Sequence, residues 1–174
     1  MLKKKLFNKW KKCRGAGIKM NKAFNIKTNE LKFDITNKLK AYIKLRGKKQ
    51  IIVGASATGK SFLFNSLEHL ISDNNTEYSN IDTSNIILIN RKDNDGTLAS
   101  KLKRNNNKLI IIDRGDILID KEAANVINLN KESNTYLIFA RAALGINLSP
   151  NYYGELYTEN DELKIKWKYS IRGW

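Results

Sequence analysis

The chain has 174 residues, of which 41% are hydrophobic and 28% charged, and it carries a net charge of +15. This length fits one domain, and no apolar stretch reaches the roughly 20 residues of a membrane-spanning helix. The single cysteine, Cys13, excludes an internal disulfide, and no signal-peptide pattern is present. We therefore expect a cytoplasmic protein without a transmembrane segment.

The positive charge is concentrated at the N-terminal end. Residues 1–50 hold 15 Lys and 2 Arg against two acidic residues, whereas basic and acidic residues balance in 51–174. This asymmetry predicts contact with nucleic acid or an anionic surface through residues 1–50. The alternative is that some of the lysine reflects an A/T-rich coding sequence, since Lys, Asn and Ile are abundant throughout.

Residues 1–24 contain no acidic residue, and Leu2, Leu6, Trp10 and Cys13 recur at helical spacing. We interpret this stretch as a basic amphipathic arm and residues 25–174 as the folded domain. The arm could bind nucleic acid phosphates, lie on a membrane interface, or dock on the domain or a partner. Docking or disorder is the alternative without a separate function.

The domain begins with an alternation of apolar and polar residues over 31–35 and 39–45, which predicts an antiparallel hairpin. Short apolar runs and helical periodicity then alternate along the chain, which favours a parallel sheet. At the C-terminal end, residues 155–158 and 163–169 predict an antiparallel pair. The apolar runs are 51–53, 86–89, 109–112 and 136–139, and the helical segments are 60–72, 97–104 and 120–129.

The segment GASATGKS, Gly54 to Ser61, follows the first apolar run and fits the spacing Gly-x-x-x-x-Gly-Lys-[Ser/Thr]. Glycines at both ends permit a tight backbone whose N–H groups point inward at a phosphate. Lys60 begins the next helix and can reach terminal phosphates, and the Ser61 hydroxyl can bind Mg²⁺. The candidate phosphate-binding residues are Gly54, Ala55, Ser56, Ala57, Thr58, Gly59, Lys60 and Ser61. The alternative is a glycine-rich turn without a ligand.

A second element agrees, because the apolar run Leu109–Ile112 ends in Asp113, a carboxylate suited to organise Mg²⁺. With these two motifs, residues 50–141 resemble the P-loop NTPase superfamily. The resemblance implies Walker A roles for Gly54, Gly59, Lys60 and Ser61, and a Walker B role for Asp113. It also implies an α/β three-layer fold with a mostly parallel central sheet that binds Mg-ATP or Mg-GTP. The strand and helix between the motifs resemble the branch that contains AAA-type ATPases.

The residue after the Walker B aspartate departs from that branch, which places a glutamate there to orient the attacking water. Here the position holds Arg114, and Asp116 follows as a substitute base. Arg114 and Arg141, each at the end of an apolar run, could neutralise phosphate charge, or could be ordinary ion-pair residues. The sequence Asn90-Arg91-Lys92-Asp93 is a poor match to a guanine-reading motif and precedes the Walker B strand, so a GTPase is disfavoured.

These features favour a Mg-ATP-binding protein that is a slow or partner-activated ATPase, with Lys60, Asp113, Asp116, Arg114 and Arg141 as catalytic candidates. A phosphotransferase with the two arginines on the phosphates is the first alternative. A scaffold that holds nucleotide without hydrolysing it is the second. A homo-oligomer could supply an arginine from a neighbouring subunit.

Overall fold

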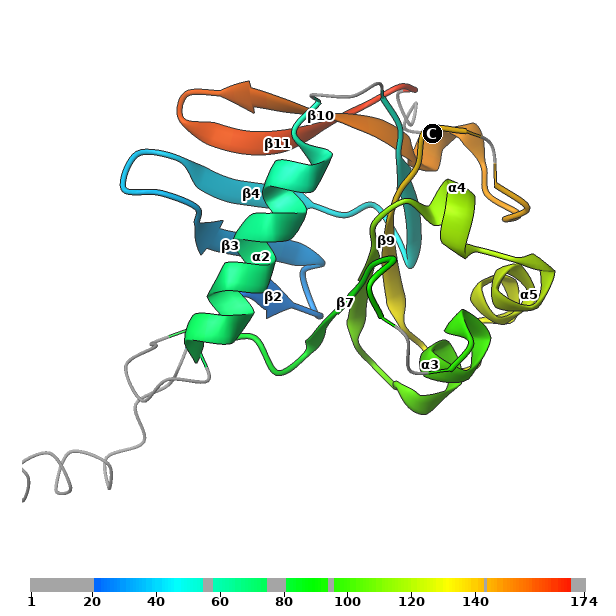
Figure 1. The fold of residues 1–174 in the computed structure, drawn as a ribbon. Helices are drawn as coiled ribbons and strands as arrows, with labels where there is room; N and C mark the ends of the chain where they lie inside the picture. The colour runs from blue at the N-terminus through cyan, green and yellow to red at the C-terminus, as the bar shows by residue number, and fades with distance from the viewer. Residues whose placement is uncertain (1–20, 55–57, 75–80, 94–95, 143, 170–174) are drawn as a thin grey trace, which may run out of the picture.

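The computed structural model describes residues 21–54, 58–74, 81–93, 96–142 and 144–169 (Figure 1). Nine strands form one sheet in the order β2-β3-β4-β11-β10-β5-β9-β8-β7, and two short strands, β1 and β6, pair with each other. The bounds are β1 (Asn21–Lys22), β2 (Phe24–Asn25), β3 (Glu30–Asp34), β4 (Lys40–Lys44), β5 (Lys49–Ile52), β6 (Ile81–Asp82), β7 (Ile86–Ile89), β8 (Leu109–Ile112), β9 (Thr135–Phe139), β10 (Tyr153–Glu159) and β11 (Glu162–Trp167).

The large sheet is mixed. β5, β9, β8 and β7 run parallel to their neighbours, whereas β2-β3, β3-β4 and β10-β11 pair antiparallel. Short parallel pairings of β10 with β5 and of β11 with β4 join the two halves. The hairpin predicted at 31–45 and the C-terminal antiparallel pair are present, but both are integral parts of the one sheet.

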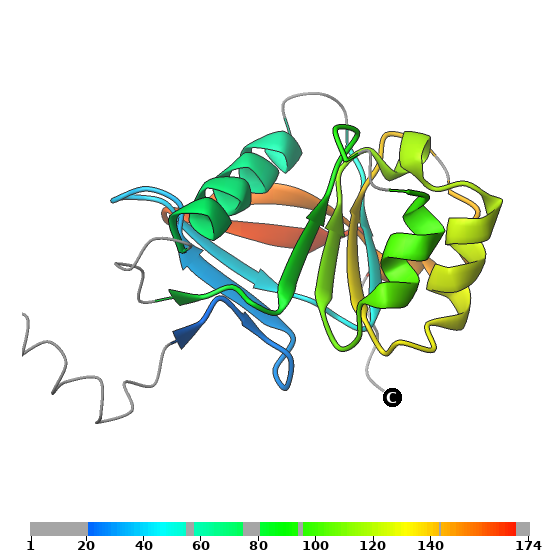
Figure 2. The ribbon, with the colours of Figure 1, turned by 60° about the horizontal axis from the view of Figure 1, so that its bottom comes forward.

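The sheet curls almost into a barrel (Figures 1 and 2). Its two edge strands approach each other at one end, because the Asn85 side chain, just before β7, donates a hydrogen bond of 2.8 Å to the carbonyl of Phe24 in β2. The predicted three-layer fold with a mostly parallel central sheet is therefore wrong. Five strands outside the parallel group extend the same sheet and bend it. The parallel strands therefore form only part of a curved, mixed sheet that few helices cover.

Helices occupy both faces of the parallel half. α2 (Lys60–Asn74) lies within the curve, and α3 (Leu98–Arg104) and α5 (Lys121–Leu129) lie on the opposite face (Figure 2). α4 (Gly115–Leu118) is a single turn, and η1 (Pro150–Tyr152) is a short 3₁₀ helix before β10. Side chains of Thr97 and Asp120 cap α3 and α5 by accepting hydrogen bonds from backbone N–H groups of the first turn.

Two apolar clusters hold these layers together. One packs Leu63 and Leu67 of α2 against strands from both halves of the sheet, and the other packs α3 and α5 against β8 and β9. β8 is buried at all four positions, as expected for a strand covered on both faces. Each fully buried Leu or Ile contributes about 1.5–3 kcal/mol, so these clusters fix the carboxyl ends of the parallel strands in place.

The packed body includes the first described residues, since Ala23 and Phe24 are fully buried. Residues 1–20, which contain the apolar positions Leu2, Leu6, Trp10 and Cys13 of the predicted arm, lie outside the described residues. Within the part of the chain that the structure describes, every helix is too short or too polar to cross a bilayer.

Candidate functional site

The candidate phosphate loop connects the end of β5 to the start of α2. Gly54 and Gly59 have φ angles of 139° and 84°, which favour glycine because a Cβ would be strained there. α2 begins at Lys60, as its periodicity predicted. Ala55, Ser56 and Ala57 lie outside the described residues. The backbone at both glycines therefore has the positive φ angles that the sequence motif led us to expect.

Lys60 is the buried cation of this region, with 7% of its surface exposed. Its Nζ donates hydrogen bonds of 2.6 Å to the carbonyl of Gly54 and 2.6 Å to the hydroxyl of Thr58. The lysine side chain thus turns back across the loop. Burial lowers the pKa of Lys60, and the positive charge of Arg141 lowers it further.

The carboxyl ends of the parallel strands bring other charges to the same place. Because β5, β9 and β8 are parallel neighbours, the residues that follow them share one edge of the sheet. Arg141 follows β9, and Asp113 follows β8, where its N–H donates a bond of 2.9 Å to the carbonyl of Ile89. Asp113, Asp116 and Glu155 lie close enough to Lys60 for their charges to oppose the lowering of its pKa.

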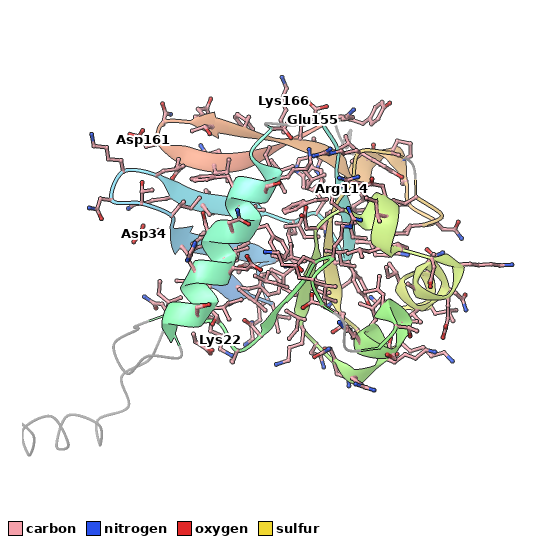
Figure 3. All side chains as sticks on the ribbon, viewed as in Figure 1. Lys22, Asp34, Arg114, Glu155, Asp161 and Lys166 are labelled. Atoms are coloured by element: carbon pink, nitrogen blue, oxygen red, sulfur yellow. The ribbon has the colours of Figure 1, made fainter. Side chains whose placement is uncertain are left out.

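Arg114, which is labelled in Figure 3, forms an ion pair with Asp116 beyond the tip of β8. Arg114 has a left-handed backbone, with φ of 57°, and its Nε and Nη2 donate to the two Asp116 oxygens at 3.3 and 3.0 Å. The N–H of Arg141 donates to the same carboxylate at 3.2 Å. Asp116 therefore ties the ends of β8 and β9 together.

The environment of Asp116 sets its charge. Burial favours the neutral form, but the hydrogen bonds from Arg114 and from the Arg141 backbone outweigh it, so the pKa of Asp116 is lowered. A carboxylate that is ionised and already bonded through both oxygens is a poor acceptor for a proton from water. The geometry thus favours a positioning role for Asp116 over the predicted role of substitute base.

The site offers two oxygen ligands for a hard cation such as Mg²⁺, the hydroxyl of Ser61 and the carboxylate of Asp113. Ser61 is exposed in the first turn of α2, and Asp113 is partly buried at the tip of β8. Within the described residues, no group of three or more His, Cys, Asp or Glu side chains could hold a metal ion. A hydroxyl and one carboxylate fit Mg²⁺, which keeps several waters and is commonly shared with substrate phosphates.

Glu155 is a residue that the sequence analysis did not select. Its strand, β10, pairs in parallel with β5 through Tyr153 with Ile51 and Gly154 with Ile52. This register carries Glu155 to the start of the phosphate loop. The alternation in 153–159 indicates that Glu155 faces outward, but nothing local in the sequence indicates which strand lies beside it.

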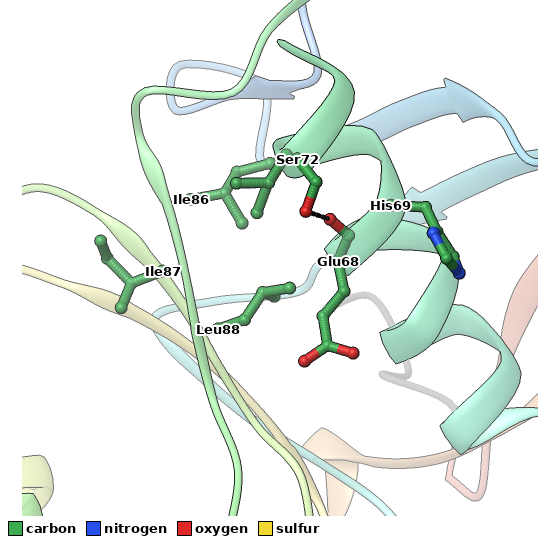
Figure 4. Close-up of a pocket in the computed structure, with 7 residues that line it drawn as sticks. Glu68, His69, Ser72, Ile86, Ile87 and Leu88 are labelled. Carbon is green, nitrogen blue, oxygen red and sulfur yellow. Dashed lines mark hydrogen bonds between the residues drawn. The ribbon is translucent and has the colours of Figure 1, made fainter. Parts of the chain in front are cut away.

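A separate hollow of about 530 Å³ lies between the second half of α2 and the edge strand β7 (Figure 4). Ile86, Ile87 and Leu88 form its strand side, and Glu68 and Ser72 form its helix side. The hydroxyl of Ser72 donates to the carbonyl of Glu68 at 2.9 Å, which is an ordinary bond within a helix. This hollow is remote from the first turn of α2 and contributes no group to the phosphate loop.

No protein-family model matches the chain, and comparisons with curated proteins and with solved structures give no match.

Proposed function

We propose that residues 54–61 bind the phosphates of Mg-ATP, as in proteins of the P-loop NTPase superfamily. The observation that carries this proposal is Lys60, a buried lysine whose Nζ bonds to Gly54 and Thr58 at the two described ends of the loop, beside the carboxyl edge of parallel strands. Ligands commonly bind outside the carboxyl ends of neighbouring parallel strands, and β5, β9 and β8 are such neighbours. A phosphate is a charged acceptor, so it would give the buried Lys60 ammonium a stronger, charge-assisted bond than a carbonyl or a hydroxyl gives.

The neighbouring groups have consistent roles in this proposal. Lys60 redirects its N–H donors from the Gly54 carbonyl to the terminal phosphates, and Arg141 supplies further positive charge. Ser61 and Asp113 would hold a Mg²⁺ ion. When bound, Mg²⁺ neutralises charge on the phosphate oxygens and orients them for in-line transfer.

Hydrolysis in this proposal is slow or depends on a partner. The two groups next to the Walker B position, Arg114 and Asp116, are paired with each other at 3.0 Å. Neither is free to move to a phosphate without breaking that pair. An arginine from another copy of the chain, or from a different partner, would supply the additional charge in trans.

The basic N-terminal region, residues 1–50, which includes the arm, forms the second part of the proposal. Residues 1–50 carry the whole net charge of +15, and we propose that they contact nucleic acid or another polyanionic surface in the cytoplasm. The described lysines of this segment include Lys38, which is exposed at the turn between β3 and β4. This contact would be the route by which a polyanion activates turnover.

The test compares nucleotide affinity in the wild type, Lys60→Met and the control Lys38→Met by calorimetric titration with Mg-ATP and Mg-GTP. Loss of one charge-assisted bond costs about 1.5–3 kcal/mol, so Lys60→Met is expected to bind about 10- to 150-fold more weakly. Lys38→Met, an identical change at an exposed site, is expected to bind as the wild type does. If Lys60→Met and Lys38→Met both bind as tightly as the wild type, Lys60 does not contact the nucleotide. If the wild type does not bind nucleotide, the proposal is refuted.

Phosphate release in the same samples, with and without DNA, separates the possible activities. Turnover supports the ATPase, and stimulation by DNA supports the role of the arm. Binding with thermal stabilisation but no turnover would indicate a scaffold. Turnover only when nucleosides or nucleotides are added as acceptors would indicate a phosphotransferase.

A further inference from the structure

Three carboxylates lie close enough to Lys60 to act on it electrostatically: Asp113 directly after β8, Asp116 in α4, and Glu155 in β10. We propose that Glu155 is the general base that accepts a proton from the water attacking the terminal phosphate. This inference rests on the proposed ATPase function. It assigns the role of general base to Glu155, because Arg114 follows Asp113 where many ATPases have a glutamate, and Asp116 is bonded to Arg114.

The strand register places Glu155 beside the loop. The N–H of Val53 donates a hydrogen bond of 2.9 Å to the carbonyl of Gly154, so β10 still pairs with the chain at the last residue before Gly54. Adjacent strands lie about 4.8 Å apart, so the Glu155 backbone is one strand spacing from the start of the loop. Figure 3 places Glu155 at the end of the molecule where α2 begins.

The other two carboxylates have partners or positions that suit different tasks. Both oxygens of Asp116 accept bonds from Arg114, and one also accepts from the Arg141 backbone. Asp113 lies at the tip of β8, where the proposed Mg²⁺ ion would take its carboxylate. Glu155 is therefore the member of the three that retains acceptor capacity for a water molecule.

The surroundings of Glu155 fit exchange of protons with solvent. Its side chain is 50% exposed and forms an ion pair of 3.2 Å between Oε1 and the Nζ of Lys168. Lys166 is its cross-strand partner on β11. An ionised carboxylate has about four acceptor sites, so one ammonium partner leaves room for water.

The proposed step is balanced without a further reactant. The water oxygen forms a bond to the terminal phosphorus while the bond from that phosphorus to the bridging oxygen breaks, which releases ADP. One proton of the water passes to Glu155, and the exposed carboxyl then returns it to solvent. Lys60 stays protonated throughout and stabilises charge on the phosphate oxygens.

The test is Glu155→Gln, which removes the proton acceptor and keeps the size of the side chain. Glu159→Gln is the matched control, because Glu159 lies on the same strand and the same face and is also paired with a lysine, Lys164, at 3.3 Å. Lys168→Ala separates the chemistry from the ion pair, since it removes the partner of Glu155 and leaves the carboxylate. Nucleotide affinity by calorimetry and the rate of phosphate release are measured for all four proteins.

We expect Glu155→Gln to bind Mg-ATP within about threefold of the wild type and to release phosphate about 10²- to 10⁴-fold more slowly, the usual contribution of a general base. The two control variants are expected to retain turnover within a few-fold. Unchanged turnover in Glu155→Gln, an equal loss in Lys168→Ala, or binding without any hydrolysis by the wild type would overturn the assignment of Glu155. Absence of binding by the wild type would instead refute the proposed function itself.

Discussion

Asparagine in place of Asp116 is expected to destabilise the protein, because this carboxylate joins the ends of β8 and β9. The Asp116 side chain is 9% exposed and accepts three N–H bonds, two from Arg114 and one from the Arg141 backbone. The amide has nearly the same volume, but it loses the charge and turns an NH₂ group towards the guanidinium. The variant therefore tests the electrostatic bond separately from packing.

The size of the effect follows from the lost charged hydrogen bonds. Such bonds contribute about 1.5–3 kcal/mol, and the partial exposure of Arg114 screens the pair, so we take about 2 kcal/mol for the Asp116 substitution. In a chain of this length, each kcal/mol shifts the melting temperature by about 2–4 °C. We expect Asp116→Asn to melt about 4–8 °C below the wild type at pH 7.

Thermal unfolding followed by circular dichroism measures this difference, with Asp120→Asn as the matched control. Asp120 caps α5 by accepting a bond of 2.8 Å from the N–H of Ala123. Asparagine caps helices about as well as aspartate, so this control is expected to melt within about 2 °C of the wild type. Equal melting temperatures for Asp116→Asn and the wild type would refute the role of Asp116 in joining the two strands.

The same comparison has a pH dependence of known sign. The pKa of Asp116 is lowered in the folded protein from its ordinary value of 3.8, so the ionised form stabilises the fold above that value. This contribution is lost as the pH falls through the lowered pKa. The difference between wild type and Asp116→Asn should therefore stay constant from pH 7 to about pH 5 and shrink below about pH 4. A difference that grows on acidification would contradict this account.

Three further predictions concern the loop, the fold and the arm. Gly54→Ala is expected to weaken Mg-ATP binding about tenfold or more in calorimetry, because the residue has φ of 139° and a Cβ would lie 3.0 Å from Thr58; unchanged affinity would contradict the loop geometry. Asn134→Ala is expected to lower the free energy of unfolding in urea by about 2–3 kcal/mol, because this fully buried amide makes two bonds to the backbone of the segment before β8, accepting from Lys108 at 2.9 Å and donating to Asn105 at 2.7 Å. A loss below 0.5 kcal/mol would show that the local backbone relaxes without it. Removal of residues 1–20 is expected to weaken DNA binding. In the full chain, six phosphate contacts would lower the affinity for DNA about 10³-fold between 50 and 200 mM salt. An affinity that does not depend on salt would contradict the role of the arm.

Local patterns in the sequence were sufficient for the elements around the candidate site. The apolar run at 51–53 and the helical periodicity of 60–72 correspond to β5 and α2, and the Gly54 and Gly59 backbones have the positive φ angles that favour glycine. These features depend on residues close together in the chain, so periodicity and residue type report them.

Local patterns could not predict which strands, distant in the sequence, pair with each other. β10 joins β5 through only two residue pairs between positions about 100 residues apart, and β11 joins β4 in a similar way. No periodicity encodes such partners, so the hairpins were predicted but their place in one curved, mixed sheet was not. β1, β2 and β6 are two-residue strands without a recognisable alternation.

The same limit applies to the surroundings of Asp116 and Glu155. Asp116 was predicted as a substitute base, but the left-handed conformation of Arg114 brings the guanidinium onto it, and that conformation is unusual for arginine. Glu155 was not selected because its proximity to the loop follows from the pairing of β10 with β5. Residue type therefore indicates which side chains can bind phosphate or accept a proton, whereas the fold determines which of them lie close together.

The most direct test of phosphate binding is a crystal structure of the protein grown with Mg-ADP, in which the distance from the Nζ of Lys60 to the nearest phosphate oxygen is measured. We expect a distance of about 2.7–2.9 Å, with the present 2.6 Å bond from Nζ to the Gly54 carbonyl replaced. A nucleotide bound elsewhere, or a phosphate in the loop with Lys60 still bonded to Gly54, would contradict the central claim.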